Sequence, residues 1–523
     1  MYKNILVINM LHIGDLLLAT PVLTTLRANY PQAHIALLAD AKIDGLVKYN
    51  KNIDELISVD KKGYHNKLSN YLKLILAIRR RKFDLVINLH ANERASALAA
   101  FSAGKRIIGY SSPGFGIFFD DLLNNKNFDH KLKNDPEIPH QAKEHLELLE
   151  TVLGIPPVDH GLEMWQDQAT EEKAAARWFS AFGQQPFKVV GFNTGASWPT
   201  KRWTPAGFAA VGDKLLEEGY GLAFFGGTMD IDNVNQILGL MKHGQHSRIA
   251  VFTGKLDLLE LGALIKKCAV FLTNDSGPMH VAVAQKAAVV AIFGSSNEVG
   301  FGPYAKAAVV LTAPGVACRP CGQHNCDHHS CMKNIKPETV SDAVITAAGA
   351  SVLEPRPAVF FDRDGVLNVD REYVYREQDF EWNSGAIETV KYFNDKGYYT
   401  FVVTNQSGVA RGFYQESDIK ALHQWINEEL ARHGAHIDAF YYCPHHPEAG
   451  NATYRKACAC RKPQPGLIFQ AMQEWPVEIA NSLLIGDNKR DVAAAEAAGV
   501  KGFLFDGDNI YEATQKYIRI MGE

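Results

Sequence analysis

Short apolar runs that end in Gly, Asn, Asp or Thr recur along the chain, and they constrain its fold more than any other feature. In the first part, the runs NILVINM, IALLAD and DLVINLH alternate with helical patterns. A second series begins near Lys188 and includes KVVGFNTG, GLAFFGG, IAVFTG, AVFLTND and AAVVAIFG. Apolar runs of strand length are typical of parallel sheets covered by helices on both faces. The sequence therefore predicts an α/β protein that begins with two doubly wound, Rossmann-like halves.

The 523 residues of the chain exceed what one ordinary hydrophobic core supports. A polar, helix-forming stretch at residues 136–183 separates the two series of strands. The segment SVLEPRP combines Pro and charge before a third series, AVFFDRDG, TFVVTNQSG and SLLIGDN. We therefore expect domains at residues 1–170, 171–346 and 358–523, with a linker at residues 347–357.

The composition restricts the classes of partner. Hydrophobic residues make up 46% and charged residues 21%, which is typical of a folded globular chain. The formal net charge of -4 provides no basic field, so nucleic acid is not an expected partner. No apolar run reaches the roughly 18 to 20 residues of a transmembrane segment, and the amino terminus reads as a strand and not as a signal peptide. A cytoplasmic protein is expected.

Two aspartates follow the apolar strand AVFF directly. Asp362 and Asp364 stand at alternate positions in the motif DRDG, whose Gly365 lets the chain turn sharply. Both carboxylates can meet one cation. Hydrolysis of a phosphomonoester needs a nucleophile in line with phosphorus, a cation and a proton donor, and two aspartates with Mg²⁺ can supply all three. Read alone, the tetrapeptide is equally compatible with a polar turn.

Three further motifs follow in this region and complete a recognisable pattern. They are Thr404-Asn405 after the second strand, Lys462 in ACRKPQPG, and Asp487 with Asp491 after the last strand. In this order, the set resembles the four motifs of the haloacid dehalogenase superfamily over nearly all of residues 358–510. The resemblance implies a haloacid dehalogenase-type α/β domain with phosphatase activity.

The same resemblance implies a role for each motif. Asp362 would be the nucleophile that becomes an aspartyl phosphate, and Asp364 would be the general acid and then the base that activates water. Thr404 and Lys462 would bind the phosphoryl oxygens. Asp487 would complete a Mg²⁺ site with Asp362 and the backbone carbonyl of Asp364.

Cysteine spacing indicates a metal site within this domain. Seven of the eight cysteines fall in two tight groups, which favours metal sites over a disulfide framework. Cys443 and His445 form one short arm and Cys458 and Cys460 the other, a spacing that suits tetrahedral Zn²⁺. Four protein ligands leave no open position, so this zinc would be structural. Free buried thiols beside a solvent-facing histidine are the alternative.

Longer stretches of sequence around these motifs indicate one family within the superfamily. DRDGVLNVDREYV, VTNQSGVARG, YYCPHHPE, CACRKPQPG and IGDN together resemble the D-glycero-D-manno-heptose 1,7-bisphosphate 7-phosphatases. The histidinol phosphatases are the nearest relatives, so heptose bisphosphate is the implied substrate and histidinol phosphate the alternative. The residues that the resemblance places around the sugar and its phosphates are Asp370, Tyr373, Asn405, Gln406, Ser407, Arg461 and Asn488. Glu372, where these enzymes usually have Gly, adds a negative charge near an anionic sugar and bears on substrate preference.

The first region carries polar groups at strand ends as well. HIGD places Asp15 after the first strand, at the start of a helix, where an acid is also favourable to the helix dipole alone. The loop NTGA is followed by Lys201, and NDSGPMH opens a helix whose backbone N–H groups would face a diphosphate. An ordinary Asp or Ser helix cap is the alternative for the second stretch.

GDLLLATP, GASWPTKRW and NDSGPMH, in this order, resemble glycosyltransferase family 9, the lipopolysaccharide heptosyltransferases of GT-B fold, over about residues 1–345. The resemblance implies inverting transfer without a bound metal, with Asp15 as the base that deprotonates the acceptor hydroxyl. The residues implied to hold the nucleotide-sugar diphosphate are Lys201, Ser276, Gly277 and His280. The donor would be ADP- or GDP-linked heptose. A glycan or lipid-linked acceptor would bring the protein to the inner membrane face as a peripheral protein.

A second cysteine group lies near the end of the transferase-like region. Cys318, Cys321, Cys326 and Cys331, with three histidines among them, could bind a second metal or an iron-sulfur cluster, and similar cysteines occur in this transferase family. Reduced, packed thiols are the alternative.

The sequence as a whole predicts two enzymes of heptose metabolism in one polypeptide. A non-catalytic nucleotide-sugar or glycan binding module is the alternative for the first.

Overall fold

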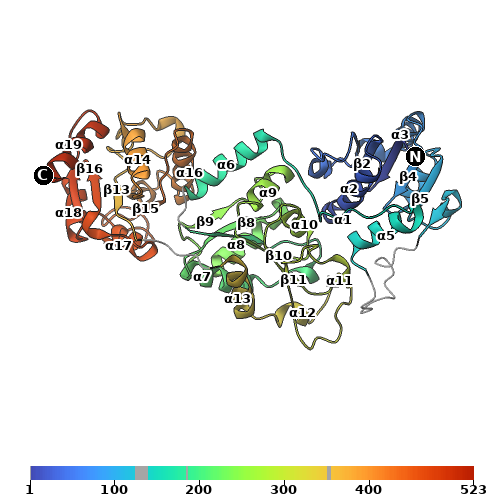
Figure 1. The fold of residues 1–523 in the computed structure, drawn as a ribbon. Helices are drawn as coiled ribbons and strands as arrows, with labels where there is room; N and C mark the ends of the chain where they lie inside the picture. The colour runs from blue at the N-terminus through green and yellow to red at the C-terminus, as the bar shows by residue number, and fades with distance from the viewer. Residues whose placement is uncertain (1, 124–138, 184–186, 350–354, 523) are drawn as a thin grey trace. The chain divides into compact units, whose positions relative to one another are not determined.

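The computed structural model describes residues 2–123, 139–183, 187–349 and 355–522 (Figure 1). The chain divides into two compact units. Unit 1 comprises residues 1–171, 188–244 and 251–350, and unit 2 comprises residues 172–187, 245–250 and 351–523. Residues 350–354 of the expected linker lie outside the described residues, and the expected domain boundaries stay predictions.

Unit 1 begins with a parallel sheet of strand order β3-β2-β1-β4-β5-β6. Its strands are β1 (Asn4–Ile8), β2 (His34–Asp40), β3 (Glu55–Val59), β4 (Leu85–Asn88), β5 (Arg106–Gly109) and β6 (Asp121–Leu122). The helices of this part are α1 (Ile13–Leu18), α2 (Thr20–Asn29), α3 (Leu68–Arg80), α4 (Glu93–Ala100) and α5 (Gln141–Leu153). The strand order reverses between β1 and β4, and the loops that leave the two strands there are where ligands bind in open α/β sheets.

A second sheet is also parallel, with the order β12-β11-β10-β7-β8-β9, and its strands belong to unit 1 except for residues 249–250 of β9. Its strands are β7 (Val189–Asn193), β8 (Gly221–Phe225), β9 (Ile249–Val251), β10 (Val270–Asn274), β11 (Val289–Phe293) and β12 (Val309–Thr312). Its helices are α7 (Pro205–Glu217), α8 (Ile231–Leu240), α9 (Leu258–Ile265), α10 (Gly277–Ala284), α11 (Glu298–Phe301), α12 (Ser330–Lys333) and α13 (Pro337–Ala348). Every residue of β7, β8, β10 and β11 is buried, which explains their uninterrupted apolar sequences. The prediction of two doubly wound halves is confirmed.

Unit 2 is built on a third parallel sheet, of order β15-β14-β13-β16-β17. Its strands are β13 (Ala358–Phe361), β14 (Tyr399–Asn405), β15 (Ala439–Cys443), β16 (Leu483–Gly486) and β17 (Lys501–Leu504). Its helices are α14 (Ala386–Asp395), α15 (Gly408–Arg411), α16 (Glu416–Arg432), α17 (Gly466–Glu474), α18 (Lys489–Ala497) and α19 (Ile510–Gly522). One core cluster contains Phe361 of β13, Val402 of β14 and Ile485 of β16. The order reverses between β13 and β16, so the loops after these strands meet at one sheet edge.

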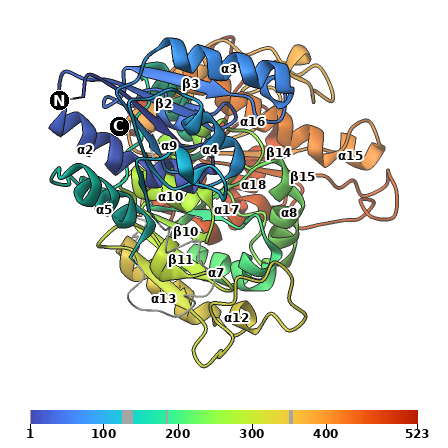
Figure 2. The same ribbon diagram turned by 90° about the vertical axis from the view of Figure 1, so that its right-hand side faces the viewer.

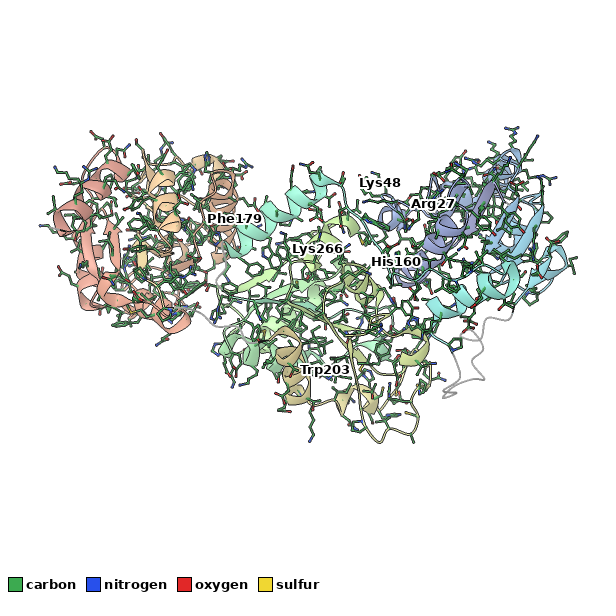
Figure 3. All side chains as sticks on the ribbon, in the orientation of Figure 1. Arg27, Lys48, His160, Phe179, Trp203 and Lys266 are labelled. Atoms are coloured by element: carbon green, nitrogen blue, oxygen red, sulfur yellow. The ribbon has the colours of Figure 1, made fainter. Side chains whose placement is uncertain are left out.

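Two earlier segments of the chain belong to unit 2. Helix α6 (Gln168–Phe182) carries Phe179, labelled in Figure 3, whose ring lies edge-on to His436 with centroids 5.6 Å apart. The hydroxyl of Ser247 lies between the two residues that end α17, because it donates to Glu474 (3.1 Å) and accepts from the indole of Trp475 (3.2 Å). Unit 2 therefore includes more of the chain than the third series of strands.

The longest helix of the described residues, α16, has 17 residues. Across the described ranges, no helix is long and apolar enough to cross a membrane.

Candidate active sites

Asp362 and Lys462 form a buried ion pair at the carboxyl end of the third sheet. Asp362 directly follows β13, and its Oδ2 lies 2.8 Å from Lys462 Nζ. The same Nζ lies 2.8 Å from Oδ1 of Asp491, which is fully buried in the first turn of α18. Burial raises the pKa of Asp362 to about 7, the Lys462 charge opposes this rise, and the negative charge of Asp491 adds to it. One lysine thus lies between two interior carboxylates.

Three carboxylates gather at this edge. Asp362, Asp487 and Asp491 each offer an oxygen, and the three oxygens lie within 4.8 Å of one another. Burial, together with the charge of Asp491, raises the pKa of Asp487. Hard oxygen ligands at this spacing fit Mg²⁺. Asp491 belongs to the last of the predicted motifs, four residues after Asp487, but the sequence predicted no individual role for it.

A glycine makes this gathering sterically feasible. Gly365 has φ +85°, and a Cβ at this position would lie 2.1 Å from Oδ2 of Asp487. The loop after β13 therefore reaches the loop after β16 only because the side chain is missing.

The carboxylate of Asp364 is held by three neighbouring side chains. Arg363 donates to both of its oxygens, with Nη2 at 2.8 Å from Oδ1 and 2.9 Å from Oδ2. Asn368 Nδ2 donates to Oδ1 at 3.1 Å, and Gln406 Nε2 donates to Oδ2 at 2.8 Å. Gln406 Nε2 also donates to the hydroxyl of Thr404 at 3.0 Å. Arg363, whose side chain is fully buried, stands within the DRDG motif, but the sequence predicted no role for it.

The residues expected around the sugar lie at several places in unit 2. Asn405 belongs to the aspartate site, because its amide donates to the backbone oxygen of Lys462 (3.1 Å) and accepts from its backbone N–H (3.0 Å). Asp370 and Tyr373 lie instead on an exposed loop, where Tyr373 makes an edge contact with the ring of Phe413 at 4.7 Å.

The remaining three expected contacts lie at element ends and near the cysteines. Ser407 precedes α15, and the side chain of Asn488 caps α18 by accepting from the N–H of Arg490. Arg461 Nη1 donates to the carbonyl of His445 at 3.2 Å, beside the predicted zinc ligands.

The predicted zinc ligands converge. The Sγ of Cys460 lies 3.2 Å from that of Cys443, 3.1 Å from that of Cys458 and 3.4 Å from Nδ1 of His445. Around a tetrahedral zinc ion, ligand bonds of about 2.0 to 2.3 Å place neighbouring ligand atoms slightly farther apart than the distances observed between these four residues. A small outward movement of the ligands would therefore admit the ion. Contact with the Cys443 thiol lowers the pKa of Cys460 to about 5, which favours the thiolate that binds zinc. The four residues fit structural Zn²⁺.

In unit 1, Asp15 lies where α1 packs against α10. Asp15 is in the first turn of α1, and its Oδ2 accepts from the N–H of His12 at 3.2 Å. Burial raises the pKa of Asp15, and the charges of His12 and Lys201 oppose the rise. A Cβ at Gly14 would lie 2.6 Å from the ring of His280 on α10. The structure therefore brings Gly14, the chain neighbour of Asp15, against His280, where the helices that follow β1 and β10 meet.

Lys201 follows β7 and lies near the start of α10. Its Nζ is 2.6 Å from Oδ2 of Asp275 and 4.4 Å from the ring centroid of Trp198. Ser276 precedes Gly277, the first residue of α10, and its hydroxyl accepts from Nδ2 of Asn193 at 2.8 Å. Burial lowers the pKa of His280 to about 4, so this imidazole is neutral at pH 7.

Backbone contacts fix the loop that carries Lys201. The N–H of Trp203, labelled in Figure 3, donates to Oδ1 of Asn274 at 3.0 Å. Nδ2 of Asn274 in turn donates to the carbonyl of Thr194 at 2.9 Å. The ends of β7 and β10 are therefore tied together where the strand order of the second sheet reverses.

The second cysteine group lies between β12 and α13, and its last member, Cys331, belongs to α12, which is labelled in Figure 2. Cys318 is exposed, Cys321 and Cys326 are partly buried, and Cys331 is buried. Among the described residues, the aspartate cluster and the predicted zinc ligands have their ligand atoms at metal-binding distances. The four cysteines of the second group do not form such a cluster among these residues. A metal at this group stays a prediction.

Two families

The fold and the polar loops define two classes of protein in one chain. Two doubly wound sheets with facing polar loops are typical of a GT-B glycosyltransferase. A parallel sheet with aspartates after adjacent strands is typical of a haloacid dehalogenase-type hydrolase. The sequence matches Glycosyltransferase family 9 (heptosyltransferase) over residues 71–331 and a HAD-hydrolase-like family over residues 459–516.

Individual relatives agree with both classes. The D-glycero-beta-D-manno-heptose-1,7-bisphosphate 7-phosphatase of Rhodopseudomonas palustris is 48% identical over 155 residues, which are 30% of this chain and 86% of that protein. The enzyme of the same name from Vibrio cholerae is 44% identical over 168 residues, 32% of this chain and 87% of that protein.

Solved structures extend the comparison to unit 1. The glycosyl transferase family 9 structure from Veillonella parvula is 34% identical, with a TM-score of 0.59, over 66% of this chain and 97% of that one. The E. coli ADP-heptose lps heptosyltransferase II, 22% identical over 66% of this chain and 98% of that one, shares the fold with a TM-score of 0.55. The chain therefore belongs to glycosyltransferase family 9, joined to the family of D-glycero-beta-D-manno-heptose-1,7-bisphosphate 7-phosphatases. Both resemblances seen in the sequence are confirmed.

Proposed function

We propose that the carboxyl-terminal region hydrolyses the 7-phosphate of D-glycero-D-manno-heptose 1,7-bisphosphate through an aspartyl phosphate on Asp362. The buried contact between Lys462 and Asp362, with Asp487 and Asp491 beside it, carries this proposal. A buried ammonium offsets the charge of an incoming phosphoryl group and holds the nucleophile in place.

The reaction needs one nucleophile and one proton carrier. A carboxylate oxygen of Asp362 attacks phosphorus, the bond from phosphorus to the sugar oxygen breaks, and Asp364 gives its proton to that oxygen. Asp364 then takes a proton from water, whose oxygen attacks the aspartyl phosphate and releases inorganic phosphate. The hydroxyl of Thr404 and the ammonium of Lys462 bind phosphoryl oxygens in both steps.

Asp362, Asp487 and the backbone carbonyl of Asp364 would hold Mg²⁺, with Asp491 nearby. When bound, the ion supplies positive charge that offsets the phosphate oxygens. The proposed sugar contacts are Asp370, Tyr373, Asn405, Ser407, Arg461 and Asn488, and the zinc loop next to Arg461 would fix that side chain.

The test is phosphate release by the full chain with Mg²⁺. Substrates are the two anomers of heptose 1,7-bisphosphate and histidinol phosphate, and the variants are Asp362→Asn and, as a matched control, the exposed Asp506→Asn. We expect release from a heptose bisphosphate that Asp362→Asn abolishes and Asp506→Asn preserves. Release from histidinol phosphate alone would overturn the heptose assignment.

We also propose that unit 1 transfers a heptosyl group with inversion from an ADP- or GDP-linked donor to a glycan or lipid-linked acceptor. The proximity of Asp15 to His280 carries this proposal, because it places a carboxylate next to the start of α10. Asp15 would take the proton of the acceptor hydroxyl. The residues near the donor diphosphate would be Lys201, Ser276, Gly277 and His280.

Asp15→Asn distinguishes transfer from binding alone. We expect this variant to bind the nucleotide-heptose by calorimetry and to lose transfer, while the exposed Asp232→Asn keeps both. Donor binding without transfer in the parent would favour a non-catalytic binding module.

A further inference from the structure

Gln406 uses all the polar atoms of its side chain within the protein. The residue is 2% exposed. Its Nε2 donates to Oδ2 of Asp364 at 2.8 Å and to the hydroxyl of Thr404 at 3.0 Å, which uses both amide hydrogens. Its Oε1 accepts from the hydroxyl of Tyr414 at 2.8 Å. Because both amide hydrogens are used, a substrate oxygen could accept from Gln406 only by displacing one of these buried bonds, so the amide is poorly suited to donate to the sugar.

The bond from Gln406 completes a fixed orientation of Asp364. The buried Arg363 guanidinium also contacts both oxygens of this carboxylate, and its Nη2 donates to the carbonyl of Val374 at 2.6 Å. Asn368 contacts Oδ1. Of these donors, only Gln406 comes from the loop after β14, so Gln406 ties the turn after β13 to the neighbouring strand end.

Tyr414 fixes the side-chain oxygen of Gln406 by a hydrogen bond. Its ring is 6% exposed and stacks on Tyr375, with centroids 4.9 Å apart and an interplanar angle of 25°. A Cβ at Gly408 would lie 2.3 Å from the Tyr414 ring, so the backbone is shaped to admit this ring. Burial raises the pKa of Tyr414 to about 12, and its hydroxyl is therefore a hydrogen donor at pH 7.

We propose that Gln406 and Tyr414 are positioning residues for Asp364, and that Gln406 sets the direction in which Asp364 delivers its proton to the leaving oxygen. This inference rests on the proposed phosphatase function. A proton donor displaced by a fraction of an ångström retains its chemistry but loses much of its efficiency, because proton transfer requires a well-aligned contact. When Gln406 or Tyr414 is replaced, the reaction rate should therefore fall for substrates whose leaving oxygen must be protonated and not for substrates whose leaving group departs as a stable anion.

Two aryl phosphates of nearly equal shape isolate this step. Phenyl phosphate leaves as a basic oxygen that needs protonation, whereas p-nitrophenyl phosphate leaves as a stable phenolate. The ratio kcat/KM reports only the steps up to formation of the aspartyl phosphate, so later use of Asp364 as a base does not enter. We would measure kcat/KM for both compounds and for the heptose bisphosphate in the parent, Gln406→Met and Tyr414→Phe. Gln424→Met, an exposed glutamine on α16, is the matched control.

We expect Gln406→Met to lower kcat/KM for phenyl phosphate and heptose bisphosphate by at least about tenfold, and to change p-nitrophenyl phosphate less than about threefold. Tyr414→Phe keeps the ring and should give the same pattern with a smaller loss. Equal losses for both aryl phosphates would indicate a general structural role and overturn the inference. A loss confined to heptose bisphosphate would assign Gln406 to sugar binding and overturn it too. If the parent hydrolysed none of the three compounds, the proposed function itself would fall.

Discussion

Nζ of Lys462 lies 2.8 Å from Oδ2 of Asp362, and both side chains are almost fully buried. The strands and loops that carry them are 100 residues apart in sequence, so the fold alone creates this pair. Because Lys462 also contacts Asp491, it reduces the repulsion between two interior carboxylates. Removal of one partner leaves a buried charge uncompensated, which costs about 3 to 5 kcal/mol of stability in proteins.

Lys462→Met should therefore affect both activity and stability. We expect phosphate release to fall at least about 100-fold, because the variant loses the charge that faces the phosphoryl group. In the absence of Mg²⁺, the free energy of unfolding of unit 2 should fall by about 3 kcal/mol in urea. Lys501→Met, at an exposed position of β17, is the control and should change neither. Retention of full activity by Lys462→Met would contradict the role given to this lysine.

Gly365→Ala should weaken the use of Mg²⁺. The new methyl group would lie 2.1 Å from Oδ2 of Asp487, so that carboxylate must move. We expect the Mg²⁺ concentration for half-maximal phosphate release to rise at least about tenfold, since one ligand is displaced. Gly397→Ala is a matched control, because Gly397 has a similar φ of +78° and no atom within 4 Å of the added Cβ. An equal effect of both variants would assign the loss to backbone strain alone.

The sequence could predict which polar residues lie at the sheet edges and could not predict how their side chains contact one another. Apolar runs followed by Asp362, Asp487 or Asp15 placed these residues at sheet edges, because parallel strands end at a common edge. The four predicted zinc ligands could be grouped for a different reason, because their spacing in the sequence defines two short arms. Partners such as Asp275 for Lys201, or Tyr414 for Gln406, depend on side-chain directions that no periodicity encodes. The inclusion of α6 residues in unit 2 depends on packing between distant segments and left no local signal.

Zinc should be removable with a defined stoichiometry. Cys458→Ser replaces a thiolate ligand by a weaker hydroxyl, so we expect the protein to lose one equivalent of zinc by elemental analysis. The melting temperature of unit 2 should fall as well, because metal binding contributes to folding free energy. The control is Cys268→Ser, which replaces a buried thiol of unit 1, and the zinc content of this variant should equal that of the parent. An unchanged zinc content in Cys458→Ser would refute the assigned ligands.

Gly14→Ala should impair the transferase and spare the phosphatase. The added Cβ would lie 2.6 Å from the ring of His280, which forces α1 and α10 apart and shifts Asp15 away from the start of α10. We expect a loss of heptosyl transfer of at least about tenfold, because small displacements of a catalytic base are costly. Gly45→Ala, where no atom lies within 4 Å of the added Cβ, is the matched control. Phosphate release should be unchanged in both variants.

The pH dependence of unit 2 should contain a contribution from Asp438. Its Oδ2 accepts from the N–H and the hydroxyl of Thr400, at 2.8 and 3.1 Å, while burial raises its pKa to about 6. The unfolded chain ionises this group near 3.8, so the folded state binds its proton more tightly. Stability from this group is therefore present below about pH 4 and is lost as the pH rises to about 6.

Asp438→Asn removes this titration and keeps an oxygen that can accept from Thr400. We expect the free energy of unfolding of the variant, relative to the parent, to rise by on the order of 2 kcal/mol between pH 4 and pH 6.5 and to stay constant above. Urea unfolding at several pH values measures the difference, and the exposed Asp506→Asn should show no such rise. A difference that falls with pH over this range would mean that the folded state favours the ionised carboxylate, because the hydrogen bonds from Thr400 would then outweigh the cost of burial.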